Sequence, residues 1–241
     1  MKKYIFAIFV VTLTLAVSNF AQSVVITPKK TVYRRPKPIA GYKRTFTVIR
    51  PRVKAATPAL SKKIEAAISY EKVSDLNIKE ETTEVQWLEE ASYTVNYNRN
   101  GILDITLSVT GTGAYPSTFN KTVVIDLKTG NRITPGMVFT NIAGLTAKGK
   151  RAREKEVKQA IIDIKKEEPD TEDPASLFGS RDFTAENLDE FSVSDKGVTF
   201  IYDYGFPHAA LALQPDGRYF FSWRELKPFI KPAGLFRRFV R

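Results

Sequence analysis

Residues 93–127 read YTVNYNRNGILDITLSVTGTGAYPSTFNKTVVIDL, and this stretch decides the fold. Apolar and polar residues alternate over 93–97 and again over 103–109, which is the period of half-buried strands. Asn100-Gly101 predicts a tight hairpin between them, because both residues tolerate a positive φ. A loop rich in Gly and Thr then leads to a third alternating run. The stretch therefore predicts an antiparallel meander.

Helical and strand patterns continue on both sides of the meander. Thr57-Pro58 supplies an N-cap and a first-turn proline for a helix that we expect to end near Tyr70. In the third run, Phe119, Val123, Ile125 and Leu127 are expected to share one face. The other expected elements are strands at 42–50, 82–88, 191–193, 198–202 and 218–223, and a second helix at 147–168. Together they predict an α+β fold: an antiparallel β-meander with two main helices packed on the sheet.

Composition excludes several classes of protein. The chain has 241 residues, no Cys and one His. Without Cys it can form no disulfide, no thiolate nucleophile and no Cys-ligated metal site. With one imidazole it can form no His-rich metal site. We therefore expect no metal and no cofactor.

The first residues, MKKYIFAIFVVTLTLAVSNFAQ, are typical of a secretory signal peptide at 1–22. Two lysines precede an apolar run of about 14 residues, which is too short to cross a bilayer comfortably, and small residues follow. The alternative is an uncleaved N-terminal anchor. The signal peptide predicts a secreted or periplasmic protein, with no transmembrane helix after cleavage.

The net charge of +11 is unevenly distributed. Residues 23–64 hold 12 basic and no acidic residues, residues 65–217 have a net charge of −9, and residues 218–241 have a net charge of +6. Pro28, Pro36 and Pro38 favour an extended linker at 23–41. This basic N-terminal arm either binds an anionic envelope surface or is a solvated tether. An exported protein has little access to nucleic acid, so we expect no nucleic-acid partner.

Two loops are candidate binding sites. Gly113-Ala114-Tyr115-Pro116 lies between two strands, and its shape would display Tyr115 as an exposed aromatic anchor. The alternative is that Tyr115 caps the core. His208 lies in Phe206-Pro207-His208; because no Gly-x-Ser-x-Gly motif is present, we interpret it as a loop histidine and not as part of a catalytic triad.

Carboxylates are the other chemically active groups. Five lie between Glu167 and Asp173, but their spacing does not match an EF-hand, which favours a solvated acidic loop over a calcium site. Glu89-Glu90 and Asp189-Glu190 are the candidates for paired acid–base work, although adjacent side chains on a strand point apart. We predict no catalytic residues.

The ordered set of motifs resembles a known family. The Gly-Ala-Tyr-Pro loop is followed by Val123-Val-Ile-Asp-Leu-Lys-Thr-Gly130, and later by the runs at 191–200 and 204–210. This order resembles bacterial envelope domains of unknown function that occur in the lysozyme-sensing anti-sigma factor RsiV and in the peptidoglycan deacetylase PdaC. The resemblance covers 42–232 and leaves a basic tail at 233–241. Where this chain has Tyr115, the family commonly has a histidine.

The resemblance implies an exported, non-catalytic binding domain. Its expected partner is a lysozyme-type protein or a cell-wall glycan, bound through the loops that carry Tyr115 and His208. A carboxylate-dependent cell-wall hydrolase and an envelope tether without a specific ligand are the alternatives.

Overall fold

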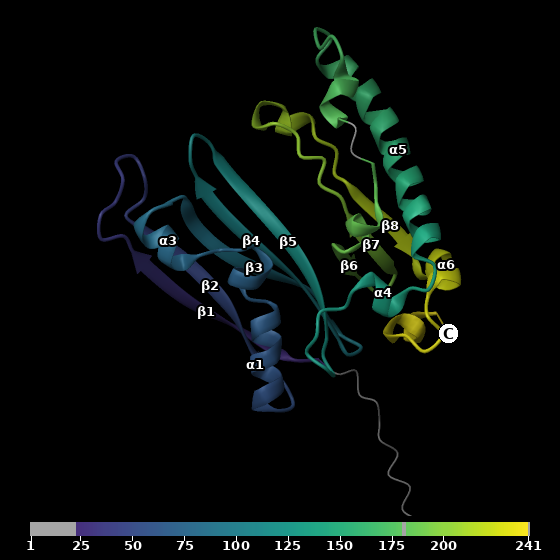
Figure 1. Cartoon of the computed structure of the whole chain (residues 1–241), viewed down its shortest axis with the longest axis horizontal. Helices are drawn as coiled ribbons and strands as arrows, with labels where there is room; N and C mark the ends of the chain where they lie inside the picture. Colours follow the sequence, from purple (N-terminus) through teal and green to yellow (C-terminus); the bar gives the residue numbers. More distant parts are fainter. Residues whose placement is uncertain (1–22, 180–181, 241) are drawn as a thin grey trace, which may run out of the picture.

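The computed structural model describes residues 23–179 and 182–240, and the predicted signal peptide at 1–22 lies outside them. Figure 1 shows two β-sheets side by side, the first with α1 and α3 beside it and the second with α5 along its outer side. The predicted α+β class is confirmed. None of the helices in the described residues has the length and hydrophobicity that a bilayer-spanning segment needs.

The first sheet has five strands in sequence order, and the predicted meander forms its second half. Neighbouring strands are antiparallel except β2 and β3, which are parallel, so the meander prediction holds for β3, β4 and β5 only. The strands are β1 (Val25–Arg34), β2 (Thr45–Lys54), β3 (Leu88–Arg99), β4 (Ile102–Thr112) and β5 (Pro116–Asp126).

Alternation of side chains creates the core of this sheet. Leu103, Ile105 and Leu107 of β4 are fully buried, while the residues between them face the other way. Asn100 and Gly101 adopt the positive φ angles of 54° and 69° that the predicted hairpin requires.

The N-terminal basic segment is a strand, which corrects the linker predicted at 23–41. β1 pairs with β2 along its whole length, from Val25 opposite Lys54 to Arg34 opposite Thr45. The strand lies at the sheet edge, where a proline such as Pro28 needs no hydrogen-bond partner and lysines remain in water. Ile26 and Tyr33 pack on the core and hold the strand in place.

Three helices connect β2 to β3: α1 (Pro58–Ala67), α2 (Tyr70–Val73) and α3 (Ile78–Thr83). The predicted cap is confirmed, because the Thr57 hydroxyl accepts the Leu60 N–H at 3.2 Å. The strand predicted at 82–88 is wrong except at Leu88, because α3 continues to Thr83 and β3 begins only at Leu88. Asn77 starts that helix by accepting the N–H groups of Lys79 and Glu80, and this local cap outweighs the strand-like composition.

We call β1–β5 with α1–α3 the first lobe, and the second sheet with the helices after β5 the second lobe. The second lobe contains the long helix α5 (Ile142–Glu167), which starts earlier than predicted because Asn141 caps it through the Gly144 N–H. Its core is rich in aromatic rings. The predicted basic tail contributes to this core, because Phe236 is fully buried against Trp223 with 5.3 Å between ring centroids. The remaining elements are α4 (Pro135–Val138), η1 (Pro174–Phe178), η2 (Ala185–Leu188), β6 (Phe191–Val193), β7 (Gly197–Ile201), η3 (His208–Leu213), β8 (Arg218–Ser222), α6 (Trp223–Leu226), η4 (Lys227–Phe229) and η5 (Leu235–Phe239).

Asp104 joins the two lobes. It lies on the face of β4 that is turned toward β6 and is fully buried. One carboxylate oxygen accepts the Ser192 hydroxyl at 2.5 Å and the Val193 N–H at 2.7 Å, and the other accepts the Asn96 amide at 2.9 Å. A buried carboxylate with three donors is well satisfied, so this contact fixes β6 against the first sheet.

Asp104→Ala should lower the free energy of unfolding by about 3 kcal/mol, because it leaves the Ser192 and Val193 donors buried without an acceptor. Urea denaturation measures the loss. Ser108→Ala is the matched control on the same face of β4; it removes an exposed hydrogen bond to Asn120 and should cost less than about 1 kcal/mol. Equal losses in the two variants would contradict the role given to Asp104.

The stability should also depend on pH through Asp104, because burial raises the pKa of its carboxyl above the ordinary value. The folded protein then holds the proton more tightly than the unfolded chain, and the associated stability is lost as the pH rises from about 4 through the native pKa. Wild type should therefore lose stability relative to Asp104→Asn as the pH rises. Urea denaturation of both proteins across this range checks the sign, and a constant difference would contradict it.

Candidate functional site

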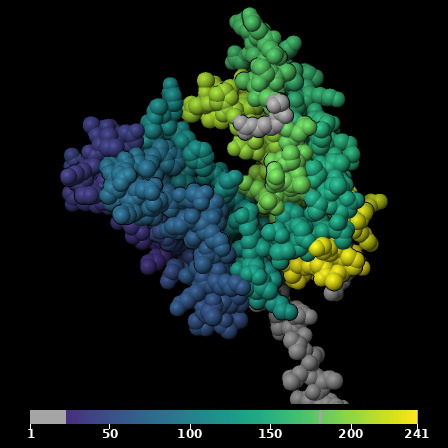
Figure 2. All heavy atoms as spheres, viewed as in Figure 1, coloured from purple at the N-terminus to yellow at the C-terminus, as the bar shows by residue number. Residues whose placement is uncertain are grey.

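The two loops predicted to bind a ligand meet in the structure. The rings of Tyr115 and His208 stack with 4.4 Å between centroids and 20° between planes. Tyr115 lies in the turn between β4 and β5, and His208 begins η3 in the other lobe. In Figure 2 the yellow-green segment around η3 reaches over to the teal tip of that hairpin. We call this stacked pair the aromatic edge.

Tyr115 is held out by a short, braced turn. β4 and β5 stay paired up to Thr112 opposite Pro116, so only three residues form the turn. The Gly113 N–H donates to the Tyr115 carbonyl at 3.3 Å. The Tyr115 side chain is 62% exposed, which excludes the alternative that it caps the core.

Trp87 supports this turn from below. A Cβ at Gly111 would lie 2.4 Å from the Trp87 carbonyl and 2.5 Å from its indole ring, so only glycine allows the close approach. A Cβ at Gly113 would lie 3.6 Å from the same indole, an ordinary contact. Trp87 in turn packs against Phe119, with 5.7 Å between ring centroids.

His208 is positioned by the residue two places before it. Phe206 is 6% exposed and packs on Phe178 at 5.1 Å between ring centroids, so it anchors the loop and contributes no exposed surface. Its N–H donates to the Gln214 side chain at 2.9 Å, which closes the loop around η3. Pro207 and His208 follow on the exposed side. Of the seven predicted site residues, Phe206 is therefore the one that the structure withdraws from the surface.

Sequence reasoning missed two features near the aromatic edge. Phe119 was expected to share a face with the apolar residues 123, 125 and 127, which are buried, yet it is 62% exposed and lines a pocket together with Glu80 and Glu81 of α3. The second feature is an acidic groove of about 280 Å³ between α5 and the end of η3. Its carboxylates are Glu156, Asp163, Glu167 and Asp216.

No ion pair with a described Lys or Arg neutralises these four carboxylates. Glu156 accepts the Tyr204 hydroxyl at 2.8 Å and the Gly217 N–H at 3.2 Å, which fixes it in place. The groove therefore places four carboxylates, none ion-paired with a described cation, beside the segment that carries His208.

In each of the two carboxylate pairs considered from the sequence, one member is engaged with a neighbour. Lys43 lies 2.5 Å from Glu89 and lowers the pKa of that carboxyl. Glu190 accepts the Lys121 ammonium at 2.8 Å and the Thr122 N–H at 3.1 Å. The described part of the chain also holds no group of three or more His, Asp or Glu side chains placed to bind a metal ion.

No protein-family model and no curated protein matches the sequence. Solved structures do show similarity to this chain. A DUF3298 family protein from Pseudomonas aeruginosa PAO1 is 12% identical, with a TM-score of 0.52 over 88% of this chain and 95% of that chain. A DUF3298 member from Bacteroides fragilis NCTC 9343 is 13% identical, with a TM-score of 0.49 over 88% of this chain and 94% of that chain.

The class defined by these features is an α+β domain with two sheets and an exposed aromatic edge. Its fold is similar to that of the Pseudomonas DUF3298 protein, and DUF3298 denotes a domain of unknown function. At 12% identity the likeness extends to the fold alone.

Gly111→Ala should destabilise the protein by about 2 kcal/mol, because the new methyl group overlaps backbone and ring atoms of Trp87. Gly113→Ala, two residues away, should change stability by less than about 0.5 kcal/mol, since its methyl group meets only an ordinary contact. Urea denaturation followed by tryptophan fluorescence compares the two. Similar effects of both substitutions would show that Trp87 does not brace the turn.

Proposed function

We propose that this chain is a non-catalytic binding domain of the bacterial cell envelope that captures a cationic, wall-degrading protein of lysozyme type. The observation that carries the proposal is the stacked Tyr115–His208 pair, exposed at the meeting point of the two lobes. Exposed aromatic side chains on braced loops are frequent anchors of protein interfaces.

The acidic groove favours a cationic partner. It begins at Ala212 and Leu213, near the end of η3, and His208 lies at the other end of this element, about 10 Å away. One partner surface can therefore contact the aromatic edge and the four carboxylates together. Opposite charge at this distance accelerates encounter and aligns the partner.

The sequence resemblance points to the same class of partner. The motifs shared with the RsiV-type domain run through both loops of the aromatic edge, and RsiV senses lysozyme. This chain replaces the commonly found histidine of the first loop by Tyr115. Tyr115 stacks on His208, so the edge keeps the histidine of the second loop and has an aromatic ring in place of the histidine of the first.

The proposal predicts that Tyr115→Ala combined with His208→Ala weakens lysozyme binding at least about tenfold, because two central contacts are removed. The measurement is a titration of purified protein with a lysozyme at low and at physiological salt. Wild-type binding should weaken with salt, since the groove attracts the partner electrostatically. Lytic activity followed in the same samples would show whether capture also inhibits.

The matched control is Met137→Ala combined with Val32→Ala, which removes two exposed apolar side chains away from the aromatic edge. Affinity should be unchanged in this control. Binding retained by the Tyr115/His208 variant would contradict the assignment of the edge. Absence of wild-type binding at either salt would contradict the partner class, and titration with wall glycan fragments would then test the remaining ligand.

A further inference from the structure

A second pocket lies at the end of the first sheet opposite Tyr115. Ile102 and Asp126 are paired at this end, while Thr112 and Pro116 are paired at the other, so the length of β4, about 33 Å, separates the two. The pocket has a volume of about 210 Å³ and lies between α1, α2 and the turn after β5. We call it the basal pocket; its lining residues are Lys63, Ala66, Ala67, Lys72, Val73, Gly130, Asn131 and Arg132.

The basal pocket holds three cations and no carboxylate. Lys63, Lys72 and Arg132 form no ion pair with any described residue. The carboxylate of Asp126, which precedes the turn, accepts the Lys128 N–H at 3.0 Å and the Thr129 hydroxyl at 2.8 Å. Three cationic side chains thus line one small cavity, and none of them is ion-paired with a described carboxylate.

The backbone around the pocket positions these cations. One amino group of the Arg132 guanidinium donates to the Asp189 carbonyl at 3.1 Å, which leaves its other N–H donors for a ligand. Gly130 has a φ of 71°, and a Cβ there would lie 3.2 Å from the Lys63 side chain. Glycine at this turn therefore lets the Lys63 stem lie close against it.

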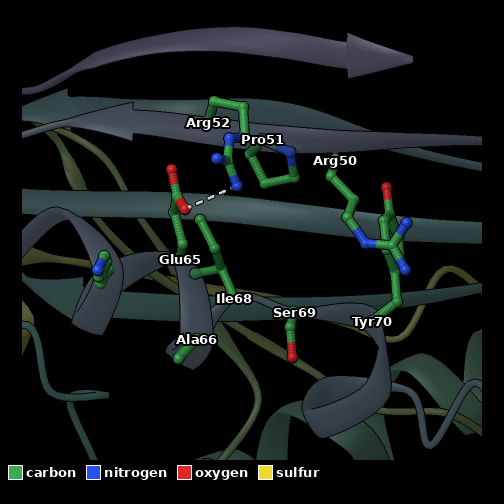
Figure 3. A pocket seen from close by; sticks show the side chains of 9 residues that line it. Arg50, Pro51, Arg52, Glu65, Ala66, Ile68, Ser69 and Tyr70 are labelled. Carbon is green, nitrogen blue, oxygen red and sulfur yellow. Dashed lines mark hydrogen bonds and ion pairs between the residues drawn. The ribbon is translucent and has the colours of Figure 1, made fainter. Parts of the chain in front are cut away.

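A neighbouring pocket also contains three cations, but two of them are ion-paired with carboxylates. It lies on the other side of α1 and shares Ala66 with the basal pocket, and its cations are Arg50, Arg52 and Lys62. In Figure 3 a dashed line joins Arg52 to Glu65, at 3.1 Å. Arg50 is likewise paired with Glu71 at 2.5 Å. Lys62 is the one cation of that pocket without an ion pair among the described residues, whereas all three cations of the basal pocket lack one.

We propose that the basal pocket binds a phosphate group. Phosphate carries up to two negative charges and several acceptor oxygens, which matches two ammonium groups and one guanidinium around a small cavity. The group can belong to a free anion or to the headgroup of an anionic phospholipid, since both present the same oxygens. The site is independent of the aromatic edge, and it differs from the basic N-terminal arm, which is the edge strand β1.

The test uses two probes: pyrophosphate in a calorimetric titration, and phosphatidylcholine vesicles with and without phosphatidylglycerol in co-sedimentation. The pocket variant is Lys63→Gln, Lys72→Gln and Arg132→Gln combined. The control variant, Lys30→Gln, Lys54→Gln and Lys79→Gln, loses the same charge from exposed positions that do not line the pocket. The pocket variant should weaken binding by at least about tenfold and the control by less than about twofold.

A single substitution, Ala66→Glu, tests the pocket in case the triple variant fails to fold. Ala66 is exposed on α1, so the substitution adds a carboxylate at the pocket without removing a cation. It should also abolish binding while circular dichroism and the melting temperature stay those of wild type.

The two probes separate the sources of the phosphate. Specific loss of pyrophosphate binding alone identifies a small anion as ligand, and specific loss of phosphatidylglycerol-dependent sedimentation identifies a lipid headgroup. If the pocket and control variants lost equal binding affinity, the binding would depend only on net charge, and the proposal would be overturned. A wild-type protein that binds neither probe would also overturn it.

Discussion

The buried carboxylate of Asp104 is the contact on which the geometry of this molecule depends. Burying an ionisable group is costly, and the cost is offset only because Ser192, Val193 and Asn96 all donate to it. Ser192 and Val193 belong to β6, so the contact fixes the second sheet against the first. Since Tyr115 extends from one lobe and His208 from the other, their stacking requires this arrangement of the lobes.

The aromatic edge also requires a rigid segment of β4 and β5 between Asp104 and Tyr115. From Asp104 to Thr112 the β4–β5 ladder is continuous, and side-chain hydrogen bonds such as Thr106 with Thr122 and Thr110 with Thr118 link the two strands on the face that carries Asp104. Trp87 then fills the space that glycine leaves at position 111. These contacts hold the edge in its shape, so a ligand of the proposed site would meet an edge that is already formed, which would reduce the entropy lost on binding.

The sequence predicts those elements whose pattern is local. The meander follows from period-two alternation and the Asn100-Gly101 turn, and α1 follows from its Thr57 cap. β1 escaped prediction because an edge strand needs few buried side chains, here Ile26 and Tyr33, and tolerates the lysines and Pro28 that are typical of linkers. The pairing of Tyr115 with His208 escaped prediction for another reason. Each loop was predicted as a candidate binding site, but the contact between them depends on how the two sheets are joined.

The distribution of charge explains why the net charge of +11 says little about the aromatic edge. Charges in water are screened over about 8 to 10 Å, whereas the basal pocket lies about 33 Å along β4 from the edge. The electrostatic field at the edge is therefore set by the nearby carboxylates Glu156, Asp163, Glu167 and Asp216. The field at the basal pocket is set by Lys63, Lys72 and Arg132. The same chain can thus attract a cation at one end and an anion at the other, and occupation of the base leaves the aromatic edge free on the far side of the molecule.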